Sequence, residues 1–340
     1  MSDRYVPPYQ ITPAILLLTA QICEIIGSIK AGPDIAAVPD LRRGNRIKTI
    51  QASLAIEGNT LSMEQVTAVI SGKRVLGLPR EVQEVRNAFG AYEKLPGWSP
   101  YSVDDLLSAH ALLMAGLVDE AGRFRSGGVG IQRGAEMVHV APPAARVPGL
   151  VAGLLRWLEH TGEHPLVAGC VFHYELEFIH PFQDGNGRIG RLWQTLILSR
   201  WRPFMALLPV ESVVRDRQQN YYSALSLSDK AADAAGFIEF MLNAILQAMR
   251  EMAVAAEQVT EQVTEQVTEQ VKRLLAVMDS KTYSARELMA KLVLMHRPTF
   301  LYSYLRPALE AGLIAMTCPD CPRSRNQRYC LTDKGRLFRG

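Results

Sequence analysis

The sequence predicts a mainly all-α protein with one β-hairpin and a small α+β module near its C-terminal end. Apolar residues recur at helical spacing over most of the first 250 residues, which predicts one helix after another. A glycine-rich stretch between Gly122 and Val140 interrupts this pattern and predicts two short strands. The 340 residues are 48% hydrophobic and 21% charged, so the chain has the length of about two domains and the composition of a globular protein.

The first helices have recognisable start and stop signals. Pro13 stands where a first-turn proline belongs, before a long apolar stretch. A second helix over residues 47–56 ends at Glu57-Gly58-Asn59, which is a stop signal. Ser62 and Gln65 have the spacing of a capping box, which opens a third helix. Further helical patterns cover residues 80–94, 103–117, 147–160, 165–178 and 187–200.

Residues 257–271 form an internal repeat. Glu-Gln-Val-Thr occurs three times from Glu257 and is followed by Glu-Gln-Val-Lys. On a helix, valines four residues apart shift around the helix axis by about 40° per repeat. The apolar residues of a coiled coil alternate steps of three and four residues, so this repeat does not match a coiled coil. A strand would put Glu and Val on the same face, so we expect a linker helix over residues 251–272.

The C-terminal module is basic. Residues 271–340 contain 13 Lys and Arg against 5 Asp and Glu, a net charge of +8, and the remaining residues carry −5. Two helices over residues 283–292 and 298–311, followed by strands near 313–317 and 328–331, match the outline of a winged helix-turn-helix. The arginines of the second helix and the wing are Arg297, Arg306, Arg323, Arg325 and Arg328.

This charge makes DNA a candidate partner, bound through its phosphates. Against it, Pro307 interrupts the presumed recognition helix, and such modules also serve in dimerisation or protein docking. Cys318, Cys321 and Cys330 offer only three ligands for zinc, so we expect them to be reduced thiols.

The N-terminal sequence predicts neither a membrane span nor export. The apolar stretch from Ile11 to Ile29 contains Glu24 and falls short of the ~20 apolar residues that a spanning helix needs. Arg4 alone is a poor start for a signal peptide. The five cysteines are odd in number and unevenly placed, which is typical of a reducing compartment, so we expect a cytoplasmic protein.

One segment, residues 180–191, combines features of a phosphate site. Gly185 and Gly187 flank Asn186 just before an apolar helix, so backbone N–H groups can converge on an anion there. Arg188 and Arg191 are three residues apart, so both can reach the same ligand.

The same segment offers a base and a metal ligand. His180 can take a proton from an attacking hydroxyl, and Asp184 is a hard oxygen ligand suited to Mg²⁺ on phosphates. Phosphate site, metal ligand and base therefore lie within twelve residues.

The segment resembles the signature of the Fic (Fido) family, H-P-F-x-[D/E]-G-N-G-R-x-x-R, with every fixed position present. The resemblance covers about residues 40–250. It implies the Fic fold, a helical core with a β-hairpin flap, and the transfer of AMP from ATP and Mg²⁺ to a hydroxyl side chain of a target protein or of the protein itself.

The resemblance also implies roles for single residues. His180 would be the base, Asp184 the Mg²⁺ ligand, and Phe182 the structural anchor of the loop. The α-phosphate would be held by Gly185, Asn186 and Gly187, and the β- and γ-phosphates by Arg188 and Arg191.

Outside the loop, the match reaches the hairpin and one later helix. Residues of the flap would pin the target segment or touch the nucleotide, and these are Val129, Gly130, Ile131 and Gln132. Tyr221 and Tyr222 match positions near the adenine, or are core residues. Asp229 stands where some relatives have Asn, and His173 is expected to be a buried structural histidine.

Residues 53–58, Ser-Leu-Ala-Ile-Glu-Gly, resemble the inhibitory motif of the same family, [S/T]-x-x-x-E-[G/N]. This implies an N-terminal inhibitory helix that carries Ser53 and Glu57. Glu57 would pair with Arg191 in the place of the γ-phosphate, so that ATP binds wrongly for transfer. In some relatives the same glutamate positions a water that removes AMP, which leaves a de-AMPylating hydrolase as an alternative.

These patterns predict four parts: an N-terminal helical region (1–95), a Fic catalytic core (96–250), the linker helix (251–272) and the winged helix-turn-helix (273–340). Many relatives are inhibited as dimers, so a homodimer is a further expectation. A third hypothesis is a transcription regulator whose core senses ATP and whose winged helix binds DNA.

Overall fold

The computed structural model describes residues 5–30, 39–128, 130–133, 136–266, 268–319, 321, 324 and 326–339. The chain divides into two compact units, each with its own packing. The first comprises the chain up to Glu24 and Gly44–Met249, and the second comprises Ile25–Arg43 and the chain from Arg250 onward. The structure is mostly helical with two small sheets, which confirms the predicted fold class.

The helices up to residue 266 are α1 (Pro13–Lys30), α2 (Pro39–Ile56), α3 (Met63–Ile70), α4 (Pro79–Lys94), α5 (Val103–Leu113), α6 (Val147–His160), α7 (Pro165–Ile179), α8 (Asn186–Trp201), α9 (Val210–Asp216), α10 (Gln218–Ala231) and α11 (Ala235–Gln266). The capping box at Ser62 and Gln65 is present, and α5 is four residues shorter than predicted. Helices α9 and α10 and the first part of α11 lie outside the predicted ranges.

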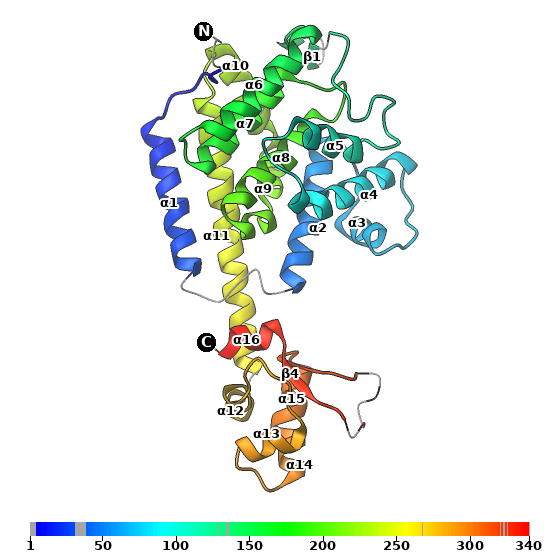
Figure 1. Cartoon of the computed structure of the whole chain (residues 1–340), viewed down its shortest axis with the longest axis vertical. Helices are drawn as coiled ribbons and strands as arrows, with labels where there is room; N and C mark the ends of the chain where they lie inside the picture. The colour runs from blue at the N-terminus through cyan, green and yellow to red at the C-terminus, as the bar shows by residue number, and fades with distance from the viewer. Residues whose placement is uncertain are drawn as a thin grey trace. The chain divides into compact units, whose positions relative to one another are not determined.

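Helices α7 and α8 form the centre of the first unit, where Figure 1 shows them next to each other. In α7 every residue from Leu166 to Leu176 is buried, and α8 is buried almost continuously up to Leu198. A helix that is surrounded by protein on all sides keeps its ends in fixed positions. The loop that joins the two helices, residues 180–185, is therefore rigidly placed.

The predicted hairpin is present. β1 (Gly130–Arg133) pairs antiparallel with β2 (Glu136–Val140), with an irregular register between Ile131 and Gln132. The glycine-rich stretch that predicts the hairpin begins at Gly122, whereas β1 begins only at Gly130, after Gly127 and Gly128. Val129, one of the four predicted flap residues, lies outside the described residues.

The second unit has its own hydrophobic core. Its elements are α12 (Glu269–Val277), α13 (Ala285–Lys291), α14 (Arg297–Thr299), a π-helical segment (Phe300–Leu305), α15 (Arg306–Glu310), β3 (Ile314–Met316), β4 (Tyr329–Leu331) and α16 (Asp333–Arg339). β3 and β4 pair antiparallel, and Leu274, Leu288 and Phe300 are among the fully buried side chains.

Two expectations for this part of the chain change. A single linker helix was expected over residues 251–272, but α11 ends at Gln266 and a new helix begins at Glu269, where the Thr268 side chain accepts a hydrogen bond from the Val271 N–H. The predicted helix over 298–311 is irregular, because Pro307 lacks the N–H that a regular turn would use and a π-helical segment precedes it.

Candidate active site

The loop between α7 and α8 carries the candidate catalytic residues. His180 ends α7 in the left-handed conformation, with φ 48° and ψ 61°, and Gly185 precedes α8 with φ 84°. A Cβ at Gly185 would lie 2.6 Å from the sulfur of Met114, so only glycine fits at this position. Phe182 is fully buried and stacks on the His110 ring with centroids 3.7 Å apart, which gives it the expected anchoring place.

Asn186 closes the loop with its side chain. Its Oδ1 accepts from the Phe182 N–H at 2.9 Å, and its Nδ2 donates to the Phe182 carbonyl at 2.8 Å. Both ends of the amide are therefore used inside the loop. Its backbone N–H lies in the first turn of α8, where N–H groups have no partner within the helix.

His110 on α5 holds the other end of the loop and was not predicted as a site residue. Its Nδ1 accepts from the Gly122 N–H at 2.9 Å, so its Nε2 carries the proton and donates to the Asp184 carbonyl at 2.9 Å. Burial lowers the pKa of His110 to about 4, so the ring is neutral at neutral pH. No motif surrounds His110 in the sequence, because its partners lie 12 and 74 residues away.

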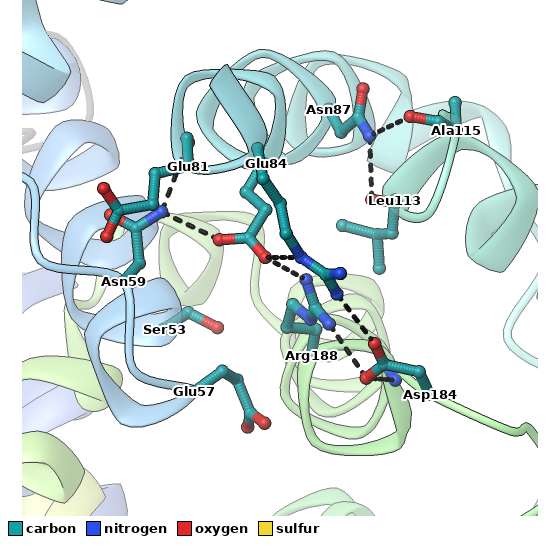
Figure 2. Close-up of polar contacts among 12 residues, drawn as sticks. Ser53, Glu57, Asn59, Glu81, Glu84, Asn87, Leu113, Ala115, Asp184 and Arg188 are labelled. Atoms are coloured by element: carbon teal, nitrogen blue, oxygen red, sulfur yellow. Dashed lines mark hydrogen bonds and ion pairs between the residues drawn. The ribbon is translucent and has the colours of Figure 1, made fainter. Parts of the chain in front are cut away.

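Arg188 and Asp184 belong to a network of ion pairs (Figure 2). The buried guanidinium of Arg188 lies 3.1 Å from Asp184 Oδ1 and 3.2 Å from Glu84 Oε1, and Arg80 lies 3.2 Å from Asp184 Oδ2. The Asn59 amide donates to Glu84 Oε2 at 2.8 Å. Arg80 and Glu84 are one turn apart on α4, and neither was predicted to reach the site.

Arg191 is held by the C-terminal part of α2. Its Nε and Nη2 donate to the hydroxyl and carbonyl oxygens of Ser53 at 3.0 and 2.9 Å, and Nη2 lies 2.8 Å from Glu57 Oε1. Burial alone would lower the pKa of Arg191, but the charge of Glu57 outweighs it and the pKa is raised above its ordinary value. The structure thus brings together the two residues of the expected inhibitory motif and the last arginine of the loop.

The carboxylate of Glu57 lies against the first turn of α8. A Cβ added at Gly187 would be 2.3 Å from Glu57 Oε1, so this close approach requires glycine. The N-terminal turn of a helix carries unpaired N–H groups and partial positive charge, which favour an anion. In this structure the carboxylate of Glu57 occupies that place.

Helix α10 holds the end of α2 in position. Gln218 and Tyr222 both donate to the Ile56 carbonyl, at 2.7 and 3.3 Å, one residue before Glu57. Tyr221, in contrast, is buried, and its hydroxyl lies 3.1 Å from His173 Nε2. Of the tyrosine pair, Tyr222 therefore borders the site and Tyr221 is a core residue.

His173 and Asp229 likewise have partners within the fold, His173 in the core and Asp229 at a partly buried position. His173 has no exposed surface, pairs with Gln194 at 2.7 Å, and has a pKa lowered to about 3 by burial. Asp229 accepts a hydrogen bond from the Tyr174 hydroxyl at 2.7 Å. Both act as structural side chains in this conformation.

Within the described ranges no group of three or more His, Cys, Asp or Glu side chains could hold a metal ion by itself, and Cys318, Cys321 and Cys330 are free thiols. None of the described helices is long and apolar enough to cross a bilayer.

Two family models match the chain. The model described as the Fic/DOC family matches residues 100–198, which include the hairpin and the loop with its two arginines. The model described as the C-terminal domain of the Fic-like protein "filamentation induced by cAMP" matches residues 269–332, which lie in the second unit.

Curated relatives match a little more than half of the chain. Protein adenylyltransferase fic-1 of Caenorhabditis briggsae is 32% identical over 202 residues, which are 56% of this chain and 38% of that protein. Protein adenylyltransferase Fic of Drosophila persimilis is 29% identical over 221 residues, which are 59% of this chain and 40% of that protein. The chain thus spans about two fifths of the length of these relatives.

Solved structures share the fold. A structure of Fic-1 from Caenorhabditis elegans is 23% identical, has a TM-score of 0.59 and covers 72% of each chain, which supports the fold alone. The crystal structure of a Fic family protein from Desulfovibrio desulfuricans G20 is 60% identical, has a TM-score of 0.73, and covers 96% of this chain and 98% of that one. With that identity over nearly the whole length, and with the family model lying on the loop of His180, this chain belongs to the Fic/DOC family.

Proposed function

We propose that the protein is a protein adenylyltransferase, which transfers AMP from ATP to a serine, threonine or tyrosine hydroxyl of a protein. The observation that carries this proposal is the convergence of two buried arginines, Arg188 and Arg191, on the first turns of α8, directly after the loop of His180. This arrangement suits a ligand with several phosphates and a reaction that needs a base beside them. The relatives that are named protein adenylyltransferases support the same activity.

The triphosphate would lie at the start of α8. The first N–H groups of this helix have no partner within it, and with the helix dipole they favour an anion. Arg188 and Arg191 would neutralise the β- and γ-phosphates, which leave together as pyrophosphate. Nη1 of Arg191 is buried and makes no hydrogen bond within the described residues, so it is a donor ready for a phosphate oxygen.

Asp184 fits as one ligand of Mg²⁺. Its side chain is 40% exposed, and carboxylate oxygens are what this ion prefers. Bound Mg²⁺ would supply neutralisation of phosphate charge. The ion pairs of Asp184 with Arg80 and Arg188 would have to loosen, and Arg188 could then turn one nitrogen towards a phosphate while Glu84 retains the other.

His180 would act as the general base. The hydroxyl oxygen of the target attacks the α-phosphorus, and its proton passes to the imidazole of His180. The new O–P bond forms while the bond from the α-phosphorus to the bridging oxygen breaks, and pyrophosphate leaves with that electron pair. A positioned base contributes ~10²–10⁴-fold to such a step. The target backbone would pair with β1 at Gly130, Ile131 and Gln132.

Glu57 would hold this site in an inhibited state. Its carboxylate lies at the anion position of α8 and pairs with Arg191, so the γ-phosphate meets a like charge and cannot reach that arginine. Removing one partner of a buried ion pair costs about 3–5 kcal/mol. ATP would therefore bind with its α-phosphate displaced from the line of attack.

The test is the intact mass of the protein after incubation with ATP and Mg²⁺. We expect added AMP on the Glu57→Gly variant, little on the wild type, and addition that is ~10²–10⁴-fold slower on Glu57→Gly with His180→Ala. If none of the three gains mass while all bind ATP, transfer to the protein itself is excluded. A cell extract without its own nucleotides then decides whether other proteins are modified, and no labelled protein there would refute the transferase.

A second candidate function is the removal of AMP. The Glu57 side chain is 29% exposed, so water can reach its carboxylate. It could orient a water for attack on the phosphorus of an AMP-modified protein, which would release AMP and restore the hydroxyl. Release of AMP from a modified target by the wild type, but not by Glu57→Gln, would favour this reaction over transfer.

DNA binding by the second unit, which the regulator hypothesis requires, has weaker support. Three of its arginines form ion pairs within the unit, namely Arg306 with Glu310, Arg328 with Glu287, and Arg336 with Asp333. Val293, Met295 and Tyr302 are exposed, which is more typical of a protein-docking face than of a DNA-binding one. Fluorescence anisotropy of a labelled duplex at increasing salt tests this, and tight binding at moderate salt would restore the regulator hypothesis.

A further inference from the structure

The side chain of Arg125 joins three segments at the active site. It is 3% exposed, and no carboxylate pairs with it in the part of the chain that the structure describes. Its Nε donates to the His180 carbonyl at 2.7 Å, and its Nη2 lies 3.3 Å from the Ile179 carbonyl. Nη1 donates to the Gly127 carbonyl at 2.9 Å and Nη2 to the Pro142 carbonyl at 2.5 Å.

The first two acceptors are the last carbonyls of α7. Carbonyls at a helix C-terminus have no partner within the helix and carry partial negative charge, so a buried cation is stabilised there without a carboxylate. The backbone N–H of Arg125 also donates to the Pro181 carbonyl at 3.0 Å. Three consecutive peptide groups, those of Ile179, His180 and Pro181, are therefore held by one residue.

His180 needs such support because of its backbone. Its φ of 48° lies in the left-handed region, which a residue with a side chain adopts only when its surroundings impose it. The direction of the imidazole depends on this backbone conformation. Arg125 bonds to the carbonyl of His180 itself, so it fixes the peptide plane that follows the base.

The other two acceptors stand on either side of the hairpin. Gly127 precedes β1 and Pro142 follows β2. One guanidinium thus connects the base of the hairpin with the C-terminal end of α7. A lysine could not replace it, because a single ammonium nitrogen lacks the flat fork that reaches these separate carbonyls.

We propose that Arg125 is a positioning residue for His180, and that its guanidinium keeps the general base and the hairpin in one fixed geometry. This inference rests on the proposed transferase function. Arg125 would not touch the nucleotide, because its contacts are on α7 and the hairpin and not on Arg188 or Arg191. Its loss would slow the chemical step and leave ATP binding intact.

The test uses Arg125→Lys in the Glu57→Gly background, with Arg200→Lys as the matched control. Arg200 also donates to two backbone carbonyls, those of Pro96 and Trp98, but lies at the far end of α8. We expect kcat for AMP transfer to fall about 100-fold in Arg125→Lys, as for a base misplaced by about 1 Å, with unchanged Kd for ATP. Arg200→Lys should change neither value.

A double-mutant cycle separates positioning from a general loss of structure. If Arg125 acts through His180, then Arg125→Lys causes no further loss of rate in a His180→Ala protein. An unchanged kcat in Arg125→Lys, an equal loss in Arg200→Lys, or an additional loss without His180 would each overturn the proposal. If Arg125→Lys does not fold, Arg125→Ala with added guanidinium ion replaces it, and the proposal expects guanidinium to restore kcat.

The outcome is distinguishable from failure of the proposed function. If the Glu57→Gly protein itself transfers no AMP, the proposed transferase function is refuted. A crystal structure of Arg125→Lys then tests, independently of activity, whether Arg125 positions His180. A changed φ at His180 together with a shifted hairpin base would support it. An unchanged His180 backbone would overturn it.

Discussion

The ion pair between Glu57 and Arg191, 2.8 Å long, has one fixed member and one that can move. Arg191 is only 2% exposed and is also bound by the hydroxyl and carbonyl oxygens of Ser53. Glu57 is 29% exposed and follows the last turn of α2, next to Gly58 with φ 91°. Release of the phosphate site therefore requires movement of Glu57, whereas Arg191 is already in place for a ligand.

Glu57→Gln should separate charge from shape at this pair. Glutamine keeps the size of the side chain and one hydrogen bond to Arg191, but it no longer repels a γ-phosphate. The proposed inhibition then predicts an order of AMP-transfer rates, with the wild type lowest, Glu57→Gln intermediate and Glu57→Gly highest. Initial rates with labelled ATP measure this order.

The control is Glu64→Gln, because Glu64 is a glutamate of the neighbouring helix α3 that accepts a hydrogen bond from Ser62. Its rate should equal that of the wild type. A Glu57→Gln rate at or below the wild-type rate would contradict inhibition by charge.

Gly187→Ala tests the closeness of Glu57 to α8. The added Cβ would lie 2.3 Å from Glu57 Oε1, so the carboxylate must leave and Arg191 loses its partner. Because Glu57 is partly exposed and Arg191 keeps its bonds to Ser53, we expect the free energy of unfolding to fall by only about 1–2 kcal/mol. In the Glu57→Gly background the same change should cost less, since the clash with the carboxylate is gone and only the contact with Arg191 Nη1, 3.0 Å from the added Cβ, remains.

The four proteins to compare are the wild type, Gly187→Ala, Glu57→Gly and the double variant. Their thermal or denaturant unfolding gives the coupling energy between positions 57 and 187. Gly149→Ala is the matched control, because Gly149 lies within α6 with open space around it and alanine favours a helix. Equal destabilisation by Gly187→Ala with and without Glu57 would show that the contact is absent in solution.

The loop and the inhibitory residue were predictable because their chemistry is continuous in the sequence. Residues 180–191 hold the base, the carboxylate and both arginines together, and Ser53 in the last turn of α2 and Glu57 directly after it belong to one short motif. The helical spacing of apolar residues and the capping residues likewise predicted the helices up to α8. The features that the sequence predicts well are therefore those that depend on residues close to one another in the chain.

The supporting side chains were not predictable for the opposite reason. Arg125 contacts residues up to 56 positions away, and Glu84 contacts Arg188 across 104 positions. Nothing in their sequence neighbourhood distinguishes them from exposed residues of a helix or loop. The bonds of the Asn186 side chain within the loop and the start of α12 at Glu269, after the Thr268 cap, were likewise not predicted.

Glu84→Gln should weaken ATP binding. Glu84 is 12% exposed and keeps Arg188 in place through their ion pair. Glu84 is itself held by a hydrogen bond from the amide of Asn59, which directly follows Glu57 and Gly58 in the chain. Without the charge, Asp184 is the one anionic partner left to the Arg188 guanidinium among the described residues, and Asp184 would be engaged with Mg²⁺. We expect about a 10-fold higher Kd for ATP in the Glu57→Gly background, which corresponds to about 1.4 kcal/mol.

Isothermal titration with ATP and Mg²⁺ measures this effect. Glu93→Gln is the control, since Glu93 is on the same helix but is 62% exposed and 3.9 Å from its partner Arg46. An unchanged Kd in Glu84→Gln would mean that Arg188 keeps its place without Glu84.

His110 should make stability depend on pH below neutrality. Its pKa is about 4 in the folded protein because of burial, against about 6.5 in an unfolded chain. The unfolded state therefore binds an extra proton between these values. The stability that comes from the neutral ring is fully present above pH 6.5 and is lost as the pH falls towards 4.

Other buried groups act in the same range, so the difference between two proteins is the useful quantity. Burial raises the pKa of Glu175 and of Glu211 to about 7, which has the opposite effect on the pH dependence and partly masks His110 in the wild type. These groups are shared by His110→Gln and cancel in the comparison. Urea unfolding at several pH values should show the stability advantage of the wild type over His110→Gln shrinking by up to about 1.4 kcal/mol per pH unit below 6.5. A constant difference from pH 7 to 4.5 would mean that burial does not hold the His110 ring in its neutral form. The neutral tautomer, whose Nε2 donates to the Asp184 carbonyl, would then not contribute to the pH dependence of stability.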